Sequence, residues 1–261
     1  MKPAPFTYHR ASSVTGAVAL LGELAEEEPK ILAGGQSLVA MMNYRMARPG
    51  HLVDITHVPG LAGIRRDGGA LRIGALTTHR DVEKADLGPD FAVLSRTMRW
   101  VGHLPIRTRG TVGGSIAHAD ATAEWCLLAV LLDAVIVVEG PAGRRDVAAG
   151  GFFLGPFTTA LEPDEVIVEI VFPRPAPRAA LTEYADRRGD FAVVAAGVDL
   201  DTESVVLGGV GSVPVAVRPA GSPGEVADGL DLRDEPGVPA SYRRGLVRTL
   251  VARAREEVPD A

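Results

Sequence analysis

The even spread of glycine and proline limits the fold of this chain more than any other sequence feature. The sequence contains 30 Gly and 19 Pro among 261 residues, and no tract of low complexity collects them. Proline ends helices and interrupts strand ladders, and glycine weakens the interior of both. The pattern therefore predicts many short helices and strands joined by turns. Hydrophobic residues make up 46% of the chain, which is enough to build packed cores around these elements.

Charge and cysteine content exclude several classes of protein. A net charge of -6 argues against a nucleic-acid binder, which needs a basic face for phosphates. The single cysteine, Cys126, allows neither a disulfide framework nor an iron-sulfur cluster built by this chain alone. The first ten residues lack the apolar core of a signal peptide, and no apolar run is long enough for a membrane span. We therefore expect a cytoplasmic protein without a membrane span.

Hydrophobic periodicity predicts the elements of the first 173 residues. A Gly-containing turn at residues 67–69 predicts a hairpin over 61–73. A glycine-rich segment lies between two further predicted helices. The predicted helices cover residues 13–26, 90–101 and 122–132, and the predicted strands cover 30–33, 52–55, 135–139 and 165–172.

Three prolines, at positions 173, 175 and 177, mark the best candidate for a domain boundary, because such a segment joins neither a helix nor a ladder. Beyond it we expect strands over 191–200 and 204–208 and a helix over 241–258. The apolar stripe of that helix is predicted to contain Tyr242, Leu246, Leu250, Ala254 and Val258. The expected units are a first lobe over residues 1–57, a second lobe over 58–173 and a C-terminal domain over 178–261.

Two pairs of adjacent glycines, Gly34-Gly35 and Gly113-Gly114, are the main candidates for a binding site. Adjacent glycines allow positive φ angles and a close approach to a ligand, so that successive N–H groups converge on an anion. Hydroxyls at Ser37, Thr111 and Ser115 would add donors. The competing interpretation is that each pair forms an ordinary tight turn. A phosphate-binding lysine loop is absent, so a phosphate here would be held by amides and hydroxyls.

Other motifs give weaker signals. A dinucleotide fingerprint beginning at Gly209 fails because Pro214 takes the third glycine position. His51, Asp54 and His57 are spaced for a helix but lie in a predicted strand, which argues against a shared metal. Cys126 is expected to be a buried, inert thiol. Pairs of arginines are expected to be solvated, at positions 65–66, 144–145, 187–188 and 243–244.

Three segments resemble one known family. The first is Ala33-Gly34-Gly35-Gln36-Ser37-Leu38, continued by Arg48-Pro49 and the strand at 52–55. The second runs from Arg107 to Asp120 and contains Thr111-Val112-Gly113-Gly114-Ser115, and the third is Gly189-Asp190-Phe191. Together they resemble the FAD-binding medium subunits of molybdenum hydroxylases, such as that of carbon monoxide dehydrogenase, and the FAD domain of xanthine dehydrogenase. The resemblance covers residues 1 to about 210.

The resemblance implies an α+β or α/β chain with a two-lobed PCMH-type FAD-binding fold and a small C-terminal α/β domain. FAD would lie between the lobes. Val101 would line the cofactor cleft, Glu124 would contact the ADP half, and Leu161 would give a backbone contact to the flavin. Glu183 stands where the family often has a lysine, and Ser115 where it has Asn or Asp. The diphosphate would be wrapped by Ile31, Leu32, Ala33, Gly34, Gly35, Gln36, Ser37 and Leu38, and by Thr111, Val112, Gly113, Gly114 and Ser115.

The resemblance also implies an activity. The chain would be an FAD-dependent oxidoreductase subunit in a hetero-oligomer, where it receives electrons from a [2Fe-2S] subunit fed by a molybdopterin subunit. It would pass them to a quinone, NAD or another acceptor. Two alternatives stay open at this point: a stand-alone FAD-dependent tailoring enzyme, or one derived from the FAD fold, acting on a small organic substrate, and a non-catalytic nucleotide-binding or assembly module. For Glu124, a simple role in the first turn of a helix also stays open.

Overall fold

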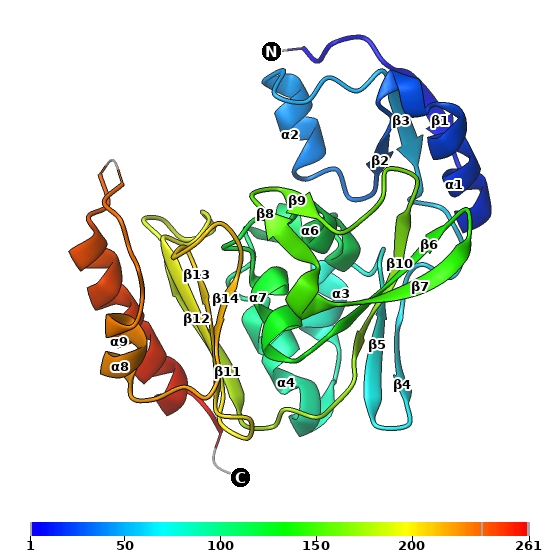
Figure 1. Ribbon diagram of the computed structural model, residues 1–261. Helices are drawn as coiled ribbons and strands as arrows, with labels where there is room; N and C mark the ends of the chain where they lie inside the picture. Colours follow the sequence, from blue (N-terminus) through cyan, green and yellow to red (C-terminus); the bar gives the residue numbers. More distant parts are fainter. Residues whose placement is uncertain (1, 236, 260–261) are drawn as a thin grey trace.

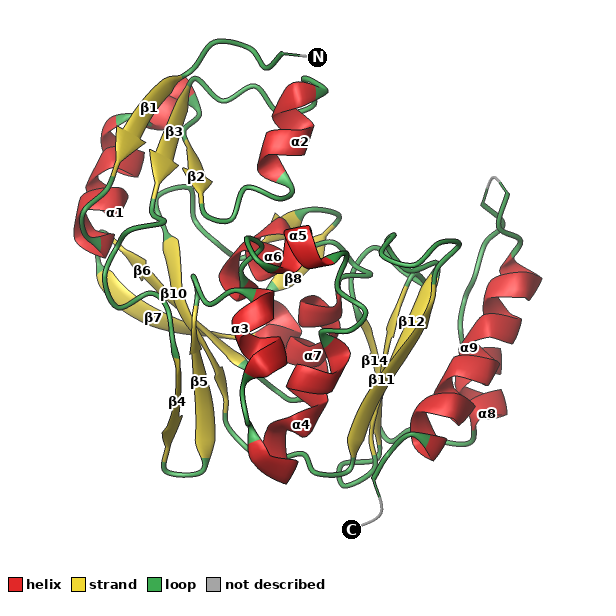
Figure 2. Cartoon of the chain, turned by 180° about the vertical axis from the view of Figure 1, so that it is seen from behind, coloured by secondary structure: helices red, strands yellow, loops and turns green. Residues whose placement is uncertain are grey.

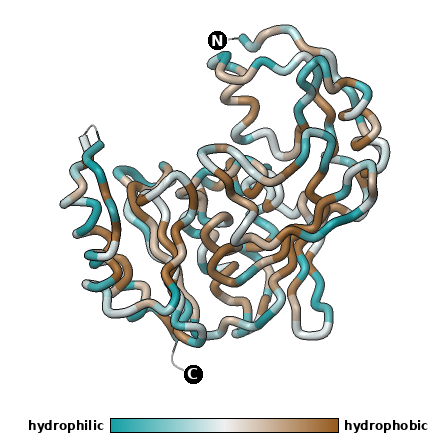
Figure 3. Tube along the Cα trace, in the orientation of Figure 1, coloured by the Kyte–Doolittle hydropathy of each residue, from teal (hydrophilic) through white to brown (hydrophobic). Residues whose placement is uncertain are grey.

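The computed structural model describes residues 2–235 and 237–259, which form three main sheets with helices between and around them (Figure 1). A parallel three-stranded sheet is followed by an antiparallel five-stranded sheet and an antiparallel four-stranded sheet. Hydrophobic segments concentrate where these sheets and the helices between them meet (Figure 3). The mixed α/β class predicted from the sequence is confirmed.

The first sheet has the strand order β1-β3-β2, and its strands are parallel. The side chain of Ser13 accepts a hydrogen bond from the Gly16 N–H and so starts α1. Buried residues of α1 share a hydrophobic cluster with one face of the five-stranded sheet. The elements are β1 (Thr7–Arg10), α1 (Val14–Glu23), the 3-10 helix η1 (Ala25–Glu27), β2 (Lys30–Leu32), α2 (Leu38–Asn43) and β3 (His51–Asp54).

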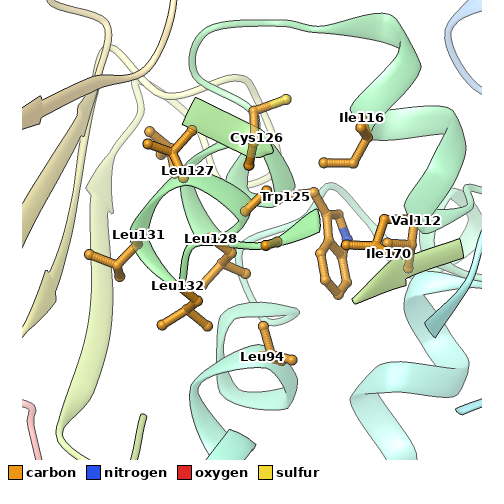
Figure 4. Close-up of a cluster of buried hydrophobic side chains, with 14 of the residues drawn as sticks. Leu94, Val112, Ile116, Trp125, Cys126, Leu127, Leu128, Leu131, Leu132 and Ile170 are labelled. Atoms are coloured by element: carbon orange, nitrogen blue, oxygen red, sulfur yellow. The ribbon is translucent and has the colours of Figure 1, made fainter. Parts of the chain in front are cut away.

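The second sheet has the order β4-β5-β10-β6-β7. Helices cover its other face, and α7 is buried along almost its whole length; its side chains meet Val112 and Ile170 in the largest hydrophobic cluster (Figure 4). The elements are β4 (Ile64–Asp67), β5 (Ala70–Gly74), α3 (His79–Lys84), α4 (Gly88–Thr97), α5 (Leu104–Arg107), α6 (Val112–His118), α7 (Glu124–Leu131), β6 (Val135–Gly140), β7 (Gly143–Ala148), the 3-10 helix η2 (Ala149–Gly151), β8 (Phe153–Gly155), β9 (Thr158–Thr159) and β10 (Val166–Phe172).

The third sheet, β11-β12-β13-β14, is held between two layers of helix (Figure 2). One face packs on α7, and Leu181, Ala195 and Val206 on that face belong to the same cluster as α7. The other face packs on α9 through a separate cluster. The elements are β11 (Ala179–Tyr184), β12 (Val194–Asp199), β13 (Ser204–Gly208), β14 (Val215–Val217), α8 (Pro223–Asp228) and α9 (Ala240–Glu256).

The structure differs from the sequence-based expectations at several points. The glycine-rich segment between the two predicted helices contains two helices that were not predicted, α5 and α6. The stripe predicted for the last helix is displaced: Tyr242 is exposed, whereas Val247 and Val251 are buried. Arg243 was expected to be solvated but is 5% exposed, because it lies on the face of α9 that packs on the sheet. Its side chain donates to the Gly209 carbonyl oxygen. The predicted limits of the three units stay predictions.

Candidate functional site

The two glycine segments, far apart in the sequence, cross each other directly. A Cβ atom added to Gly34 would lie 2.1 Å from the carbonyl oxygen of Arg109 and 2.9 Å from Cα of Gly110. No side chain fits at position 34 without moving backbone. Gly34 is therefore approached closely by the second segment of the chain, and its predicted approach to a ligand stays a prediction.

The first segment leaves a row of backbone donors unused. Among the described residues, no acceptor takes the N–H groups of Gly34, Gly35, Gln36 or Ser37. Gly35 has a φ of 72°, so one of the two glycines has the predicted positive φ. Four apolar residues predicted for the site lie half-buried along the same stretch: Ile31, Leu32, Ala33 and Leu38. The segment therefore offers free N–H donors next to partly exposed apolar surface.

The second segment is used differently from the prediction. Thr111 is the N-cap of α6, and its hydroxyl accepts from the Gly114 N–H at 3.1 Å. Val112 N donates to Thr77 O at 3.0 Å, and Gly113 N donates to Ala75 O at 2.9 Å. The chain itself therefore accepts from the N–H groups of Val112, Gly113 and Gly114, and the binding of an anion by this segment stays a prediction.

The two glycines of the second segment also lack the predicted positive φ, since both belong to α6. Gly113 is needed for packing, because a Cβ there would lie 2.6 Å from Cβ of Ala75. Ser115, on the same helix, is half-buried. The contribution of this segment to a ligand therefore depends on its shape and side chains rather than on free amides.

A buried pair of aromatic side chains supports the crossing. Trp125 Nε1 donates to His79 Nδ1 at 3.0 Å. The backbone N–H of His79 donates to the Gly110 carbonyl oxygen at 3.0 Å. Burial, with a smaller effect from the Arg107 charge, lowers the pKa of His79 to about 4, so the imidazole is neutral near pH 7. Sequence reasoning missed both residues, because only the fold brings them together.

Arg107 holds the backbone around another predicted site residue. Its Nη1 donates to the carbonyls of Val101 and Gly102 at 3.2 and 3.0 Å, and its Nε donates to Glu83 at 3.2 Å. The Val101 side chain is 8% exposed and belongs to the largest hydrophobic cluster. Arg107 thereby fixes the turn that leads into the second segment.

Glu124 and Glu183 come from different parts of the chain, and both carboxyl groups have a raised pKa. Glu124 is the first residue of α7, as its alternative role predicted, and is half-buried. Glu183 lies on β11 and is 8% exposed. Burial raises the pKa of Glu183 to about 8, and the Glu124 charge adds to the effect. Burial likewise raises the pKa of Glu124 to about 7, with a contribution from Asp120.

The remaining candidates lie outside this arrangement or act structurally. Leu161 follows β9 and is half-buried; its contact with a flavin stays a prediction. Burial raises the pKa of the Cys126 thiol well above its usual value, in agreement with an inert cysteine. His51 is hydrogen-bonded to His9 and Glu27, each at 2.7 Å. In the described ranges, no three His, Cys, Asp or Glu side chains are placed to hold a metal ion.

Comparison with known proteins finds a matching family model and several related chains. The family model described as the FAD binding domain in molybdopterin dehydrogenase matches residues 4–175. The chain is 37% identical to the 6-hydroxypseudooxynicotine dehydrogenase complex subunit alpha of Paenarthrobacter nicotinovorans, over 97% of this chain and 94% of that one. It is 41% identical to the carbon monoxide dehydrogenase medium chain of Hydrogenophaga pseudoflava, over 76% and 70% of the two chains.

Solved structures show the same architecture. The structure superimposes on carbon monoxide dehydrogenase from Hydrogenophaga pseudoflava with a TM-score of 0.90 and 32% identity, covering 99% of this chain and 98% of that one. Quinoline 2-oxidoreductase from Pseudomonas putida 86 gives a TM-score of 0.89 at 30% identity, with the same coverage. Across the described residues, no helix combines the length and apolarity needed to cross a bilayer.

Proposed function

Because the chain belongs to the family of FAD-binding domains in molybdopterin dehydrogenases, we propose that it works as the FAD-carrying subunit of a molybdenum hydroxylase complex. The observation that carries the proposal is the crossing of Gly34 over Arg109 and Gly110, with free donors on one side of it. Bound FAD supplies the electron chemistry that amino-acid side chains lack. The chain's own task is to hold, orient and shield that cofactor.

The residues present fit a dinucleotide with a diphosphate. The unused N–H groups at residues 34–37 suit a doubly charged anion, and the half-buried apolar residues beside them suit flat rings. We assign the diphosphate to this first segment. The α6 segment would then close the site through Thr111, Gly114 and the Ser115 hydroxyl rather than through a set of free amides. Glu124 would accept from hydroxyl groups of the ADP half.

The partners follow from the same assignment. With one buried cysteine, this chain holds no iron-sulfur cluster of its own, so we propose that a [2Fe-2S] subunit and a molybdopterin subunit complete the assembly. The 6-hydroxypseudooxynicotine dehydrogenase relative is itself named as a subunit of a complex and matches nearly the whole chain. This coverage favours the subunit over the stand-alone enzyme. A cytoplasmic location is part of the proposal.

A substitution at Gly34 tests the assignment. Gly34→Ala would place a Cβ 2.1 Å from the Arg109 carbonyl oxygen, so the crossing must open. The wild-type chain is expected to purify yellow and to release FAD on denaturation, while the variant loses most of its FAD. Gly245→Ala is the matched control, because Gly245 lies on α9 with no atom within 4 Å of the added Cβ. A colourless wild-type chain that binds no added FAD would overturn the proposal.

A further inference from the structure

The first strand of the third sheet, β11, has one open edge. Among the described residues it pairs only with β12. The carbonyl oxygens of Arg178 and Tyr184 point toward β12, because each accepts a backbone N–H from a residue next to that strand, at 3.1 and 2.8 Å. Backbone groups of successive residues point to opposite edges of an antiparallel strand. The N–H and carbonyl groups of Ala179 and Leu181 therefore point to the open edge.

These edge groups are buried, although no strand pairs with them. Ala179 is 0% exposed and Leu181 is 3% exposed. Within the described ranges, no protein acceptor takes the N–H group of either residue. Buried backbone N–H groups nearly always have a partner in the protein, in ordered water or in a ligand. An occupant that offers oxygen atoms is therefore expected along this edge.

A cavity of about 240 Å³ adjoins the open edge, between β11 and the helix α4 that lies beside it (Figure 2). Its volume exceeds the space that one water molecule needs. It is smaller than the pockets of about 300 Å³ or more that bind drug-sized molecules. The cavity therefore has the size for a small ion together with some water.

The side chains that α4 contributes to the cavity can donate hydrogen bonds. Thr97 is 2% exposed, and no other group in the described part of the chain is hydrogen-bonded to its hydroxyl. Arg96 is exposed, and its Nε donates to the Ala92 carbonyl oxygen at 3.3 Å. No carboxylate of the described residues pairs with Arg96, whereas Arg99 pairs with Glu257 at 2.6 Å. The lining therefore carries one uncompensated positive charge.

This combination favours an anion over other kinds of occupant. A cation would be repelled by Arg96, and an apolar molecule would leave the buried amides and the Thr97 hydroxyl without partners. An anion with several oxygen atoms can accept from all of these donors. Water in the remaining volume, or a protonated oxygen of the ion, would serve the carbonyl groups at the same edge.

We propose that the cavity binds a small oxyanion, a phosphate or a carboxylate, between α4 and the open edge of β11. The amides of Ala179 and Leu181 and the hydroxyl of Thr97 donate to the ion, and Arg96 supplies the charge. None of the residues that line the cavity belongs to the two glycine segments, so the inference does not depend on the proposed function. The bound ion would join α4 to the third sheet and stabilise their packing.

The test is calorimetric titration of the FAD-saturated full-length chain with inorganic phosphate and, separately, with acetate, at low ionic strength. Saturation with FAD prevents the first glycine segment from acting as a competing phosphate site. We expect one anion per wild-type chain, and the tighter of the two probes identifies the chemical class of the ligand. Arg96→Gln should weaken binding about tenfold or more, because it removes a charge-assisted hydrogen bond.

Matched variants separate charge, hydroxyl and non-specific effects. Arg96→Lys keeps the charge and should stay within about threefold of wild type, and Thr97→Val keeps the shape and should weaken binding about three- to tenfold. Arg144→Gln removes the same charge from the exposed end of β7, outside the cavity, and should bind like wild type.

Hydrogen exchange gives a second readout that locates the ion. An anion at about ten times its Kd should slow exchange about tenfold at the amides that donate to it. We expect this protection in a peptide that covers residues 178–184 of the wild-type chain, and none in Arg96→Gln at the same anion concentration. Peptides from the β6–β7 hairpin should be unchanged in both.

Each remaining outcome overturns the proposal. If neither anion binds at millimolar concentration, the cavity holds water alone. If an anion binds but Arg96→Gln and Thr97→Val keep wild-type affinity, or if residues 178–184 gain no protection, the ion lies elsewhere. A chain that binds no FAD would contradict the proposed function but not this inference, because the comparison at the exposed position 96 needs no cofactor.

Discussion

At the residue scale, the buried hydrogen bond between Trp125 and His79 matters because each side chain is the hydrogen-bond partner of the other inside the core. Trp125 is 0% exposed, and its Nε1 donates to a histidine that also donates its backbone N–H to Gly110. The bond therefore connects the hydrophobic core to the backbone that crosses Gly34. Damage to it should reach the candidate cofactor site through Gly110.

Trp125→Phe tests this bond. The smaller ring removes the Nε1 donor, leaves His79 Nδ1 without its partner and opens a small cavity beside Phe172. We expect a loss of about 2–4 kcal/mol in the free energy of unfolding, measured by urea denaturation. FAD retention after dialysis should also fall. Phe153→Leu, at the β8 strand away from His79, gives a comparable loss of aromatic volume, and it should leave FAD retention unchanged if the bond matters.

His79 should also make the protein sensitive to acid. Its pKa lies near 4 in the folded state, below the usual histidine value, so the unfolded chain takes up the proton first as the pH falls. The stabilisation is complete above about pH 6.5 and is lost toward about pH 4, with a total on the order of 3 kcal/mol. His79→Asn keeps an acceptor for Trp125 but does not titrate. Its unfolding free energy should fall less between these two pH values, and equal slopes would contradict the assignment.

At the element scale, Arg218 joins the C-terminal sheet to the carboxyl end of α7. Its Nη2 donates to the carbonyls of Val130 and Leu131 at 2.7 and 3.2 Å, and its Nη1 pairs with Asp133 at 2.5 Å. These are the carbonyl groups that a helix leaves unpaired at its C-terminus, where a positive charge is favourable. One side chain thus caps a buried helix from the neighbouring domain.

Arg218→Met tests the cap. The methionine keeps much of the apolar stem but leaves the Val130 carbonyl without its side-chain donor and the Leu131 carbonyl with Arg174 alone, so we expect the free energy of unfolding to fall by about 1–3 kcal/mol. The value is measured by urea denaturation at neutral pH. Arg248→Met removes an exposed ion pair with Asp228 and should cost less than about 1 kcal/mol. Equal costs for the two variants would show that Arg218 is an ordinary surface charge.

How far the sequence predicts each element depends on whether its signal is local. The residues of α1, β3 and β10 repeat with helical or strand periods, and these elements were predicted correctly. Residues 112–118 contain two glycines, so their local preference is for a turn; they become α6 because Thr111 caps the helix and Ala75 accepts from Gly113. β11 was missed because Glu183 interrupts its apolar pattern, and its partner strand and α7 complete its environment.

The candidate site also contains features that a local sequence pattern predicts and features that only the fold creates. The glycine pairs were visible in the sequence, and the positive φ of Gly35 agrees with what such a pair allows. The contact between Gly34 and Arg109 depends on how two distant parts of the chain meet, and the burial of Glu183 depends on a third sheet. Such contacts join residues that no local pattern relates. The family resemblance drew attention to Glu183, and only the fold shows that it is buried on β11.

At the scale of the whole molecule, the proline-rich segment after β10 separates the chain in sequence but not in its core. Leu181, Ala195 and Val206 from beyond that segment belong to the same buried cluster as α7 and β10. Gly197 lies so close to α7 that an added Cβ would meet Leu131 at 3.0 Å. The C-terminal sheet therefore encloses one side of the core that contains α7 and β10.

A chain truncated after residue 177 should consequently fail to fold as a stable unit. Removal of the sheet exposes the buried face of α7, including Leu127 and Leu131, both 0% exposed in the full chain. Burial of a leucine side chain contributes about 2 kcal/mol, so the loss of several such contacts is comparable to the whole stability of a domain. We expect the fragment to bind hydrophobic dyes, to aggregate and to lose cooperative thermal unfolding by circular dichroism. A soluble fragment that unfolds cooperatively near the thermal midpoint of the full chain would show instead that the core around α7 is stable without the C-terminal sheet.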